Sequence, residues 1–326
     1  MTAAVRQAAR PTRPVPVLLW WKELVIAGLF YLVYSIVRNT FGAGAEQRTI
    51  AFRHARSIIR VEDALGLWFE PELQAWYLSL PANGFIRGWN IFYGTAHFVV
   101  TIGVLVFAFV RSPAKYLFAR TVLAGTTALA LIGFATYTLM PPRLLDADGS
   151  FGACSGQVQG CNDYGIIDTI ERWGGLWKFG EGGMADLSNQ YAAMPSLHFA
   201  WSMWCAVTFV VVVGRGRWRH LAYLYPAVTT FCILITGNHF WLDALFGGVV
   251  LLGGVAVALV SQRINSWLIE RRLRDQVVAD DSEASAEAGS EAEPGTESGA
   301  RSAGSNAGGD QADGTPERPA SATGGP

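Results

Sequence analysis

Long runs of apolar residues, separated by shorter polar stretches, occupy most of the first 265 residues of the chain. A helix of about 20 apolar residues is long enough to cross the hydrocarbon core of a bilayer. The apolar runs predict about six such helices, at residues 20–37, 89–110, 117–140, 198–214, 221–236 and 240–261. The pattern therefore predicts an all-α, polytopic membrane protein with its membrane domain at residues 20–265.

Arginine and lysine residues are concentrated in two short turns between these runs, at 111–116 and 214–220. Because short basic loops stay on the cytoplasmic side of a membrane, we expect both turns and both chain termini in the cytoplasm. The expected location is the plasma membrane. The two long segments, 39–88 and 141–197, then face the outside.

The outer segment 39–88 combines basic and apolar residues at near-helical spacing. The basic residues are Arg48, Arg53, Arg56 and Arg60, and the apolar residues opposite them are Ile50, Ile58 and Val61. A helix with one basic and one apolar face can lie in the membrane interface, and we expect this arrangement here; a helix in a water-exposed loop is the alternative. Glu62 and Asp63 are expected to anchor the segment among its arginines.

Composition agrees with a membrane protein. The chain has 326 residues, of which 51% are hydrophobic and 16% are charged, whereas about a quarter of the residues of soluble domains are charged. The 12 Trp and 10 Tyr residues suit the aromatic belts of the two membrane interfaces, although a large soluble core could also use them.

The two ends of the chain differ from the membrane domain. The 1–19 segment is expected to be cytoplasmic, and the first apolar run is expected to be a retained helix, because Arg38-Asn39-Thr40-Phe41 follows it in place of a cleavage site. Residues 276–326 hold ten Asp and Glu against two Arg, a net charge of −8, so that the rest of the chain carries about +7. With few large apolar residues, this acidic tail is predicted to be disordered, and we expect no catalytic role for it.

The cysteines provide an independent observation on topology. Cys154 and Cys161 lie in the outer segment 141–197, among Gly, Ser, Asn and Asp residues that favour turns. On the predicted topology this segment faces the oxidising side of the membrane, where disulfides persist. A Cys154–Cys161 disulfide is therefore plausible, and two free thiols or an incomplete metal site are the alternatives. Cys205 and Cys232 fall within apolar runs and are expected to be small core residues.

Three polar clusters interrupt the apolar chain. They are Pro141-Pro142-Arg143 at the outer end of the third run, Met194-Pro195-Ser196-Leu197-His198 at the start of the fourth, and Gly237-Asn238-His239-Phe240-Trp241-Leu242-Asp243 at the start of the sixth. Counting the membrane crossings places all three clusters at the same, outer face. Ionisable residues at membrane depth are costly and are usually retained for function.

The residues of the three clusters suit phosphoryl transfer without a metal. His239 and Asp243 share one face of a helix, so the carboxylate can orient the imidazole and leave its other nitrogen free to attack. His198 can donate a proton to a leaving oxygen, and Arg143 offers a planar fork suited to phosphate. Ser196 and the backbone amides at a helix start can hold further phosphate oxygens.

Other interpretations of these residues stay open. Arg143 alone could be an interfacial arginine, and His198 alone a polar residue at a helix start. Three side chains, His198, His239 and Asp243, could instead ligate a catalytic zinc ion. A transporter or structural protein with a His/Asp proton relay is a further alternative, but it leaves the gathering of three clusters unexplained. For His97 we favour a structural role.

The paired motifs Pro195-Ser196-Leu197-His198 and His239-x-x-x-Asp243 resemble those of the type 2 phosphatidic acid phosphatase superfamily. The Pro141-Pro142-Arg143 lead-in and Gly237-Asn238-His239 look like its inositol phosphorylceramide synthase-like branch. Three features depart from the commonest superfamily pattern, and two of them are that Leu197 replaces a Gly and that Cys232 and Ile233 replace a Ser-Arg pair. The first motif also lacks a Lys ahead of its Arg. The leucine and the missing arginine occur in the synthase-like branch, so they point toward it.

The resemblance implies a six-helix phosphatidic acid phosphatase-like bundle and an enzyme that forms a phosphohistidine intermediate. It implies that His239 is the nucleophile, Asp243 its orienting partner and His198 the general acid and base, with Arg143 and Ser196 holding the phosphate. The expected substrate is a lipid phosphate, with transfer of inositol phosphate as one form of the reaction. We expect no cofactor, no metal ion and no nucleic-acid partner.

Overall fold

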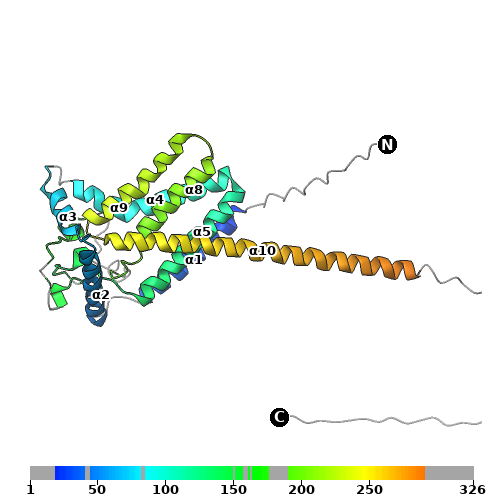
Figure 1. The fold of residues 1–326 in the computed structure, drawn as a ribbon, viewed down its shortest axis with the longest axis horizontal. Coiled ribbons are helices and arrows are strands. Elements are labelled where there is room, and N and C mark those ends of the chain that lie inside the picture. Colours follow the sequence, from blue (N-terminus) through cyan, green and yellow to red (C-terminus); the bar gives the residue numbers. More distant parts are fainter. Residues whose placement is uncertain are drawn as a thin grey trace, which may run out of the picture. The chain divides into compact units, whose positions relative to one another are not determined.

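The computed structural model describes residues 19–40, 45–81, 85–149, 151–156, 161, 164–175 and 190–290 (Figure 1). Within these ranges the regular elements are helices, and the extended backbone is limited to one isolated parallel bridge between Leu139 and Ala192. The prediction of an all-α membrane protein is therefore confirmed. The 1–18 segment and residues 291–326 lie outside the described residues.

Each predicted membrane crossing corresponds to a helix. The helices are α1 (Trp20–Thr40), α4 (Ile86–Arg111), α5 (Pro113–Thr136), α8 (Leu197–Val213), α9 (Leu224–Ile235) and α10 (Trp241–Ser290). By length and composition, α4, α5 and α10 can cross a membrane, and α8 is a shorter apolar helix. The predicted run at 221–236 is divided between α9 and the 3₁₀ helix η4 (Arg217–Tyr223), which precedes it.

The membrane helices pack closely, with α4 against α5, α8 and α9, and α1 against α5 (Figure 1). Glycines of α10 allow close approach to its neighbours: a Cβ atom on Gly247 would lie 2.5 Å from the Ser196 carbonyl oxygen, and one on Gly254 would lie 2.6 Å from that of Val122. Small residues serve the same purpose at many helix contacts within membranes. Gly247 thus lets the start of α8 lie directly against α10.

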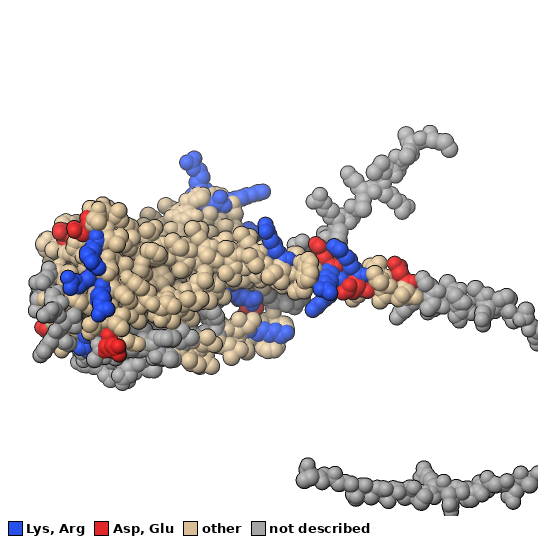
Figure 2. Space-filling model, turned by 60° about the horizontal axis from the view of Figure 1, so that its bottom comes forward, with Lys and Arg blue, Asp and Glu red and all other residues tan. Residues whose placement is uncertain are grey.

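The outer surface of the helices is apolar. Large side chains exposed on them include Val99, Ile102, Val106, Ile132 and Leu252. In Figure 2 most of the surface over the helices is tan, with few Lys, Arg, Asp or Glu residues on it. Soluble proteins rarely expose large continuous apolar areas. In a membrane, lipid chains cover such a surface.

Two helices, α2 (Ala45–Ala64) and α3 (Glu70–Ser79), form the segment between the first two membrane helices. The predicted amphipathic helix is present as α2, which buries Phe52 and Ile58 and exposes Arg53 and Arg56. The prediction that Glu62 lies among the arginines is wrong. Its side chain is fully buried on the apolar side of α2. There it accepts a hydrogen bond from the backbone N–H of Leu242 in α10.

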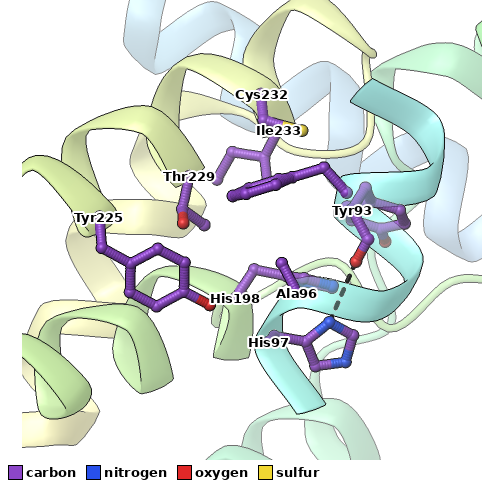
Figure 3. Close-up of a pocket in the computed structure, with 9 residues that line it drawn as sticks. Tyr93, Ala96, His97, His198, Tyr225, Thr229, Cys232 and Ile233 are labelled. Carbon is purple, nitrogen blue, oxygen red and sulfur yellow. Dashed lines mark hydrogen bonds between the residues drawn. The ribbon is translucent and has the colours of Figure 1, made fainter. Parts of the chain in front are cut away.

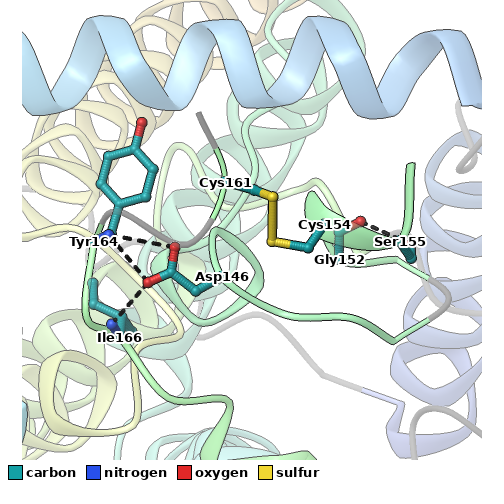
Figure 4. The surroundings of a disulfide bond; sticks show 7 residues. All are labelled: Asp146, Gly152, Cys154, Ser155, Cys161, Tyr164 and Ile166. Carbon is teal, nitrogen blue, oxygen red and sulfur yellow. Dashed lines mark hydrogen bonds between the residues drawn. A yellow bond between two sulfur atoms is a disulfide. The ribbon is translucent and has the colours of Figure 1, made fainter. Parts of the chain in front are cut away.

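The segment between α5 and α8 contains η2 (Pro142–Leu144), η3 (Cys154–Gly156) and the short helix α6 (Thr169–Trp173). Cys154 and Cys161 are bonded to each other (Figure 4). Beside them the Asp146 carboxylate accepts hydrogen bonds from the backbone N–H groups of Tyr164 and Ile166, both at 3.2 Å. These bonds give an irregular segment a defined path. Cys205 and Cys232 are free and buried, as predicted.

The chain divides into two compact units, Met1–Trp267 and Leu268–Pro326. In the second unit the described residues are helical as far as Ser290. Residues 276–290, which the composition predicts to be disordered, are therefore helical. Their alanines and glutamates are good helix formers, so a helix that enters this segment can continue through it without a packed core.

Candidate active site

His239 lies between Asp243 and His198. It precedes the first turn of α10, and its Nδ1 is 3.2 Å from Oδ2 of Asp243. The same carboxylate oxygen accepts a hydrogen bond from the backbone N–H of Phe240 at 3.0 Å. On the other side of the ring, Nε2 of His239 is 3.3 Å from Nδ1 of His198, at the start of α8.

The partners of His239 determine the positions of its protons. An ionised carboxylate can only accept hydrogen bonds, so Asp243 selects the tautomer of His239 that carries its proton on Nδ1. Nε2 then presents a lone pair, and Nδ1 of His198 must donate the proton between the two rings. His239 is 3% exposed and Asp243 is fully buried, which shields this arrangement from bulk water.

Arg143 is held by three side chains. Its Nε donates to Asn238 at 3.0 Å, Nη1 donates to Asp168 at 2.6 Å and Nη2 donates to Gln190 at 2.6 Å. The Arg143 side chain is 10% exposed, and its charge is balanced by Asp168. A guanidinium has five N–H donors, so two remain beyond these three bonds.

Backbone hydrogen bonds join the three polar clusters. The N–H of Arg143 donates to the Gly237 carbonyl at 2.7 Å, and the N–H of Ser196 donates to the Asp243 carbonyl at 2.9 Å. Gly237 has a φ of 64°, which a residue with a side chain rarely adopts. This turn brings Arg143 close to Asn238, next to His239. The three clusters, far apart in the sequence, thus form one site.

Ser196 has a different environment from the one expected of a phosphate ligand. It is fully buried, and its hydroxyl caps α8 by accepting a hydrogen bond from the N–H of Phe199 at 3.4 Å. α8 begins at Leu197, next to His198, and the N–H groups at a helix N-terminus favour anions. In this structure, the seryl side chain positions the helix that carries His198.

The model of one protein family, described as the PAP2 superfamily, matches residues 56–259. The chain belongs to the PAP2 superfamily. The match covers more than half of the chain and includes all three polar clusters. Membership supports a membrane phosphatase or phosphotransferase type of function. No curated protein and no solved structure matches the chain.

The PAP2 site of this chain includes aromatic contacts that the sequence did not indicate. The ring of Tyr93, from α4, stacks on His198 with centroids 4.2 Å apart, and the ring of His97 meets His198 edge-on at 4.4 Å. Nδ1 of His97 lies 3.0 Å from the Tyr93 carbonyl oxygen (Figure 3). Both residues line a small pocket with Tyr225 and Thr229 of α9. His97 thus contacts the His198 ring, and its structural role stays a prediction.

Sequence analysis did not connect four further polar residues with the site. Asp168 and Gln190 hold Arg143, and Glu62 and Glu70 bind the first turn of α10. Burial raises the pKa of Glu62 to about 9, and the charges of Glu70 and Asp243 contribute to the increase. Burial also raises the pKa of Glu70. None of the four lies in a short motif, and their positions depend on how distant segments pack.

The side chains of the site do not form a ready metal cage. Among the described residues, no group of three or more His, Cys, Asp or Glu side chains is arranged to hold a metal ion. Both ring nitrogens of His239 face protein groups, Asp243 and His198. The chemistry that these residues can perform by themselves is nucleophilic attack by an imidazole, with proton transfer by a second imidazole.

Proposed function

We propose that this PAP2 protein is a lipid phosphate phosphatase or phosphotransferase that works through a phosphohistidine on His239. The observation that carries the proposal is the position of His239 between a carboxylate at 3.2 Å and a second imidazole at 3.3 Å. A histidine oriented by a carboxylate on one side and faced by a proton donor on the other has the two partners that phosphoryl transfer needs.

In the first step, Nε2 of His239 attacks the phosphorus atom, and the bond from phosphorus to the leaving oxygen breaks. The leaving oxygen takes the proton from His198, and the lipid alcohol departs. Asp243 stabilises the positive charge that develops on the His239 ring. The substrate phosphoryl group enters between the two rings, where the hydrogen bond between them now lies.

In the second step, the oxygen of a water molecule or of an acceptor alcohol attacks the phosphohistidine. His198, now neutral, removes the proton from the attacking oxygen, and the bond between phosphorus and Nε2 breaks. Water as acceptor gives a phosphatase, and a hydroxyl group gives a transferase. His198 ends protonated, and His239 returns to its starting tautomer.

The phosphoryl oxygens are held by Arg143 and by the N-terminal amides of α8 in this proposal. The two remaining N–H donors of Arg143 can bind two oxygens in its planar fork. Asp168, Gln190 and Asn238 fix the direction of the fork. Because donors held in advance need no reorganisation, they stabilise the charge of the transition state effectively.

The synthase-like motifs favour a transferase with an inositol-containing donor or acceptor. Support for this finer proposal is the sequence alone: Pro141-Pro142-Arg143, Leu197 in place of Gly, and Gly237-Asn238-His239. On the predicted topology the reaction occurs at the outer face of the plasma membrane, where the substrate is a lipid phosphate of the outer leaflet.

The experiment is an assay of the purified full chain in detergent with a panel of lipid phosphates, with and without inositol. Free phosphate and new phospholipid are measured in the presence and absence of a chelator. Chelator-resistant activity that is lost in His239→Ala and kept in the exposed His220→Ala supports the proposal. Activity that requires added metal indicates a metal-dependent hydrolase, and no turnover of any lipid phosphate contradicts the proposal.

A further inference from the structure

Two buried carboxyl groups from outside the membrane bundle hold the start of the helix that carries the site. Oε1 of Glu62, from α2, accepts a hydrogen bond from the backbone N–H of Leu242 at 3.3 Å. Oε1 of Glu70, from α3, accepts one from the N–H of Trp241 at 2.9 Å. The first N–H groups of a helix have no partner within it, so these carboxyl groups satisfy donors that would otherwise be buried and unpaired.

Together with Asp243, the two glutamates complete a set of three carboxyl groups on three consecutive N–H groups. Asp243 binds the N–H of Phe240 at 3.0 Å with the same oxygen that faces His239. The clamp formed by Glu62 and Glu70 therefore acts on the two residues between His239 and Asp243. A shift of this turn would change the distance between the imidazole and its carboxylate.

The clamp contains more negative charge than its surroundings balance. Glu62, Glu70 and Asp243 are each at most 1% exposed. The charged groups that act on Glu62 are Glu70 of α3 and Asp243 of α10, and both are acidic. Two buried carboxylates whose charges act on each other cannot both stay ionised at low cost.

One oxygen of the pair is a candidate position for a proton. Oε2 of Glu62 is buried, and none of the described residues donates a hydrogen bond to it. The charge of the Glu70 carboxylate acts on Glu62, and an ionised carboxylate has no proton of its own to donate. A proton on Oε2 of Glu62 removes the negative charge from this buried oxygen. Glu70 already accepts from two backbone N–H groups, those of Trp241 and Phe69, so it is the better-stabilised anion.

We propose that Glu62 and Glu70 are positioning residues that share one proton, carried by Glu62, and that this neutral–ionised pair holds the first turn of α10 so that His239 and Asp243 stay aligned. The pair touches neither the substrate nor the reacting atoms. The catalytic half of the inference rests on the proposed function, because it takes His239 as the nucleophile.

The proton makes the clamp sensitive to alkaline pH. Burial, with the charges of Glu70 and Asp243, raises the pKa of Glu62 from 4.5 to about 9. Between these two values the folded protein binds one more proton than the unfolded chain, so this contribution to stability falls as the pH rises through that window. Above about pH 9 the two carboxylates repel each other and the clamp opens.

The test compares Glu62→Gln with Glu62→Ala, and uses Asp63→Asn, an exposed neighbour on α2, as the matched control. Glutamine keeps the acceptor for Leu242 and a donor toward Glu70 but cannot ionise; alanine keeps neither. The full chain in detergent is melted between pH 5 and pH 9.5, which needs no substrate. Glu62→Gln is expected to melt several degrees above wild type at pH 9.5, with the difference shrinking toward pH 5, while Asp63→Asn follows wild type.

The kinetic part of the test uses the pH profile of kcat. Glu62→Ala is expected to lose at least tenfold in kcat, and Glu62→Gln is expected to retain most of the wild-type kcat. The kcat of wild type is expected to decline near pH 9, and this decline should be absent in Glu62→Gln. A glutamine variant that melts in parallel with wild type at every pH overturns the shared proton. Equal kcat values in the alanine and glutamine variants overturn the positioning role. If wild type turns over no lipid phosphate, the proposed function fails, and the melting experiment still decides the shared proton.

Discussion

His198 and His239 are 41 residues apart in the sequence, and Nδ1 of the first lies 3.3 Å from Nε2 of the second. The contact joins the start of α8 to the start of α10. Because Asp243 occupies the other nitrogen of His239, the two histidines are not equivalent. In the proposed mechanism, His239 is the nucleophile and His198 is the proton donor.

This difference predicts a dependence on the leaving group. A general acid contributes most when the leaving oxygen is strongly basic, as a lipid alkoxide is. His198→Ala should therefore lose about 10²–10⁴-fold in the first step with a lipid phosphate, and far less with an activated aryl phosphate. Single-turnover rates with the two substrates measure the effect. An equal loss with both substrates would argue against proton donation by His198.

Asp243→Asn should keep the fold and lose most of the rate. The amide can donate to Nδ1 of His239, which favours the wrong tautomer, and it lacks the charge that stabilises the imidazolium. Removal of the corresponding carboxylate in other enzymes costs about 10⁴-fold in kcat. Turnover of well-folded Asp243→Asn at pH 7 measures the loss. A loss below tenfold would show that His239 does not need this partner.

Arg143→Lys should weaken phosphate binding and lower kcat. Lysine keeps the charge but not the fork, so it cannot reach Asn238, Asp168 and Gln190 at once. Asp168→Asn is the informative companion, because it removes the charge partner of Arg143 and leaves the arginine in place. We expect a smaller loss of kcat/KM in Asp168→Asn than in Arg143→Lys. The reverse order would mean that Arg143 serves mainly to hold Asp168.

The topology predicts which face of the membrane each loop occupies. Ser79 is exposed at the end of α3. This helix lies against the C-terminal end of α9, where Gln74 donates a hydrogen bond to the Ile235 carbonyl oxygen at 3.2 Å. Arg217 is exposed in η4, at the other end of α9. In intact cells, a membrane-impermeant maleimide should label Ser79→Cys and miss Arg217→Cys. Labelling of Arg217→Cys alone would reverse the predicted orientation.

Much of this site could be predicted from the sequence because its motifs are local. The spacing of His239 and Asp243 determines which side chains share a helical face, and the number of apolar runs places their helix start beside that of His198. Family membership and the helical fold agree with these predictions. The membrane boundaries were less well predicted, since η4 and α9 share one apolar run.

The supporting residues could not be predicted because they depend on tertiary packing. Glu62 follows the arginines of α2 in the sequence, and its charge suggested an ion pair with them. In the structure it lies on the buried side of the helix, where the free N–H groups of α10 are better partners. Tyr93 and Asp168 likewise contact the site only through the packing of α4 and α6.

The most direct test of the central proposal is the identity of the phosphorylated residue. The full chain is mixed with a lipid phosphate labelled at phosphorus, quenched within a single turnover at alkaline pH, and mapped by peptide. We predict acid-labile, base-stable label on His239, present in His220→Ala and absent in His239→Ala, which should also lack turnover. Label on His198, or intact turnover in His239→Ala, would contradict the assignment of His239 as the nucleophile.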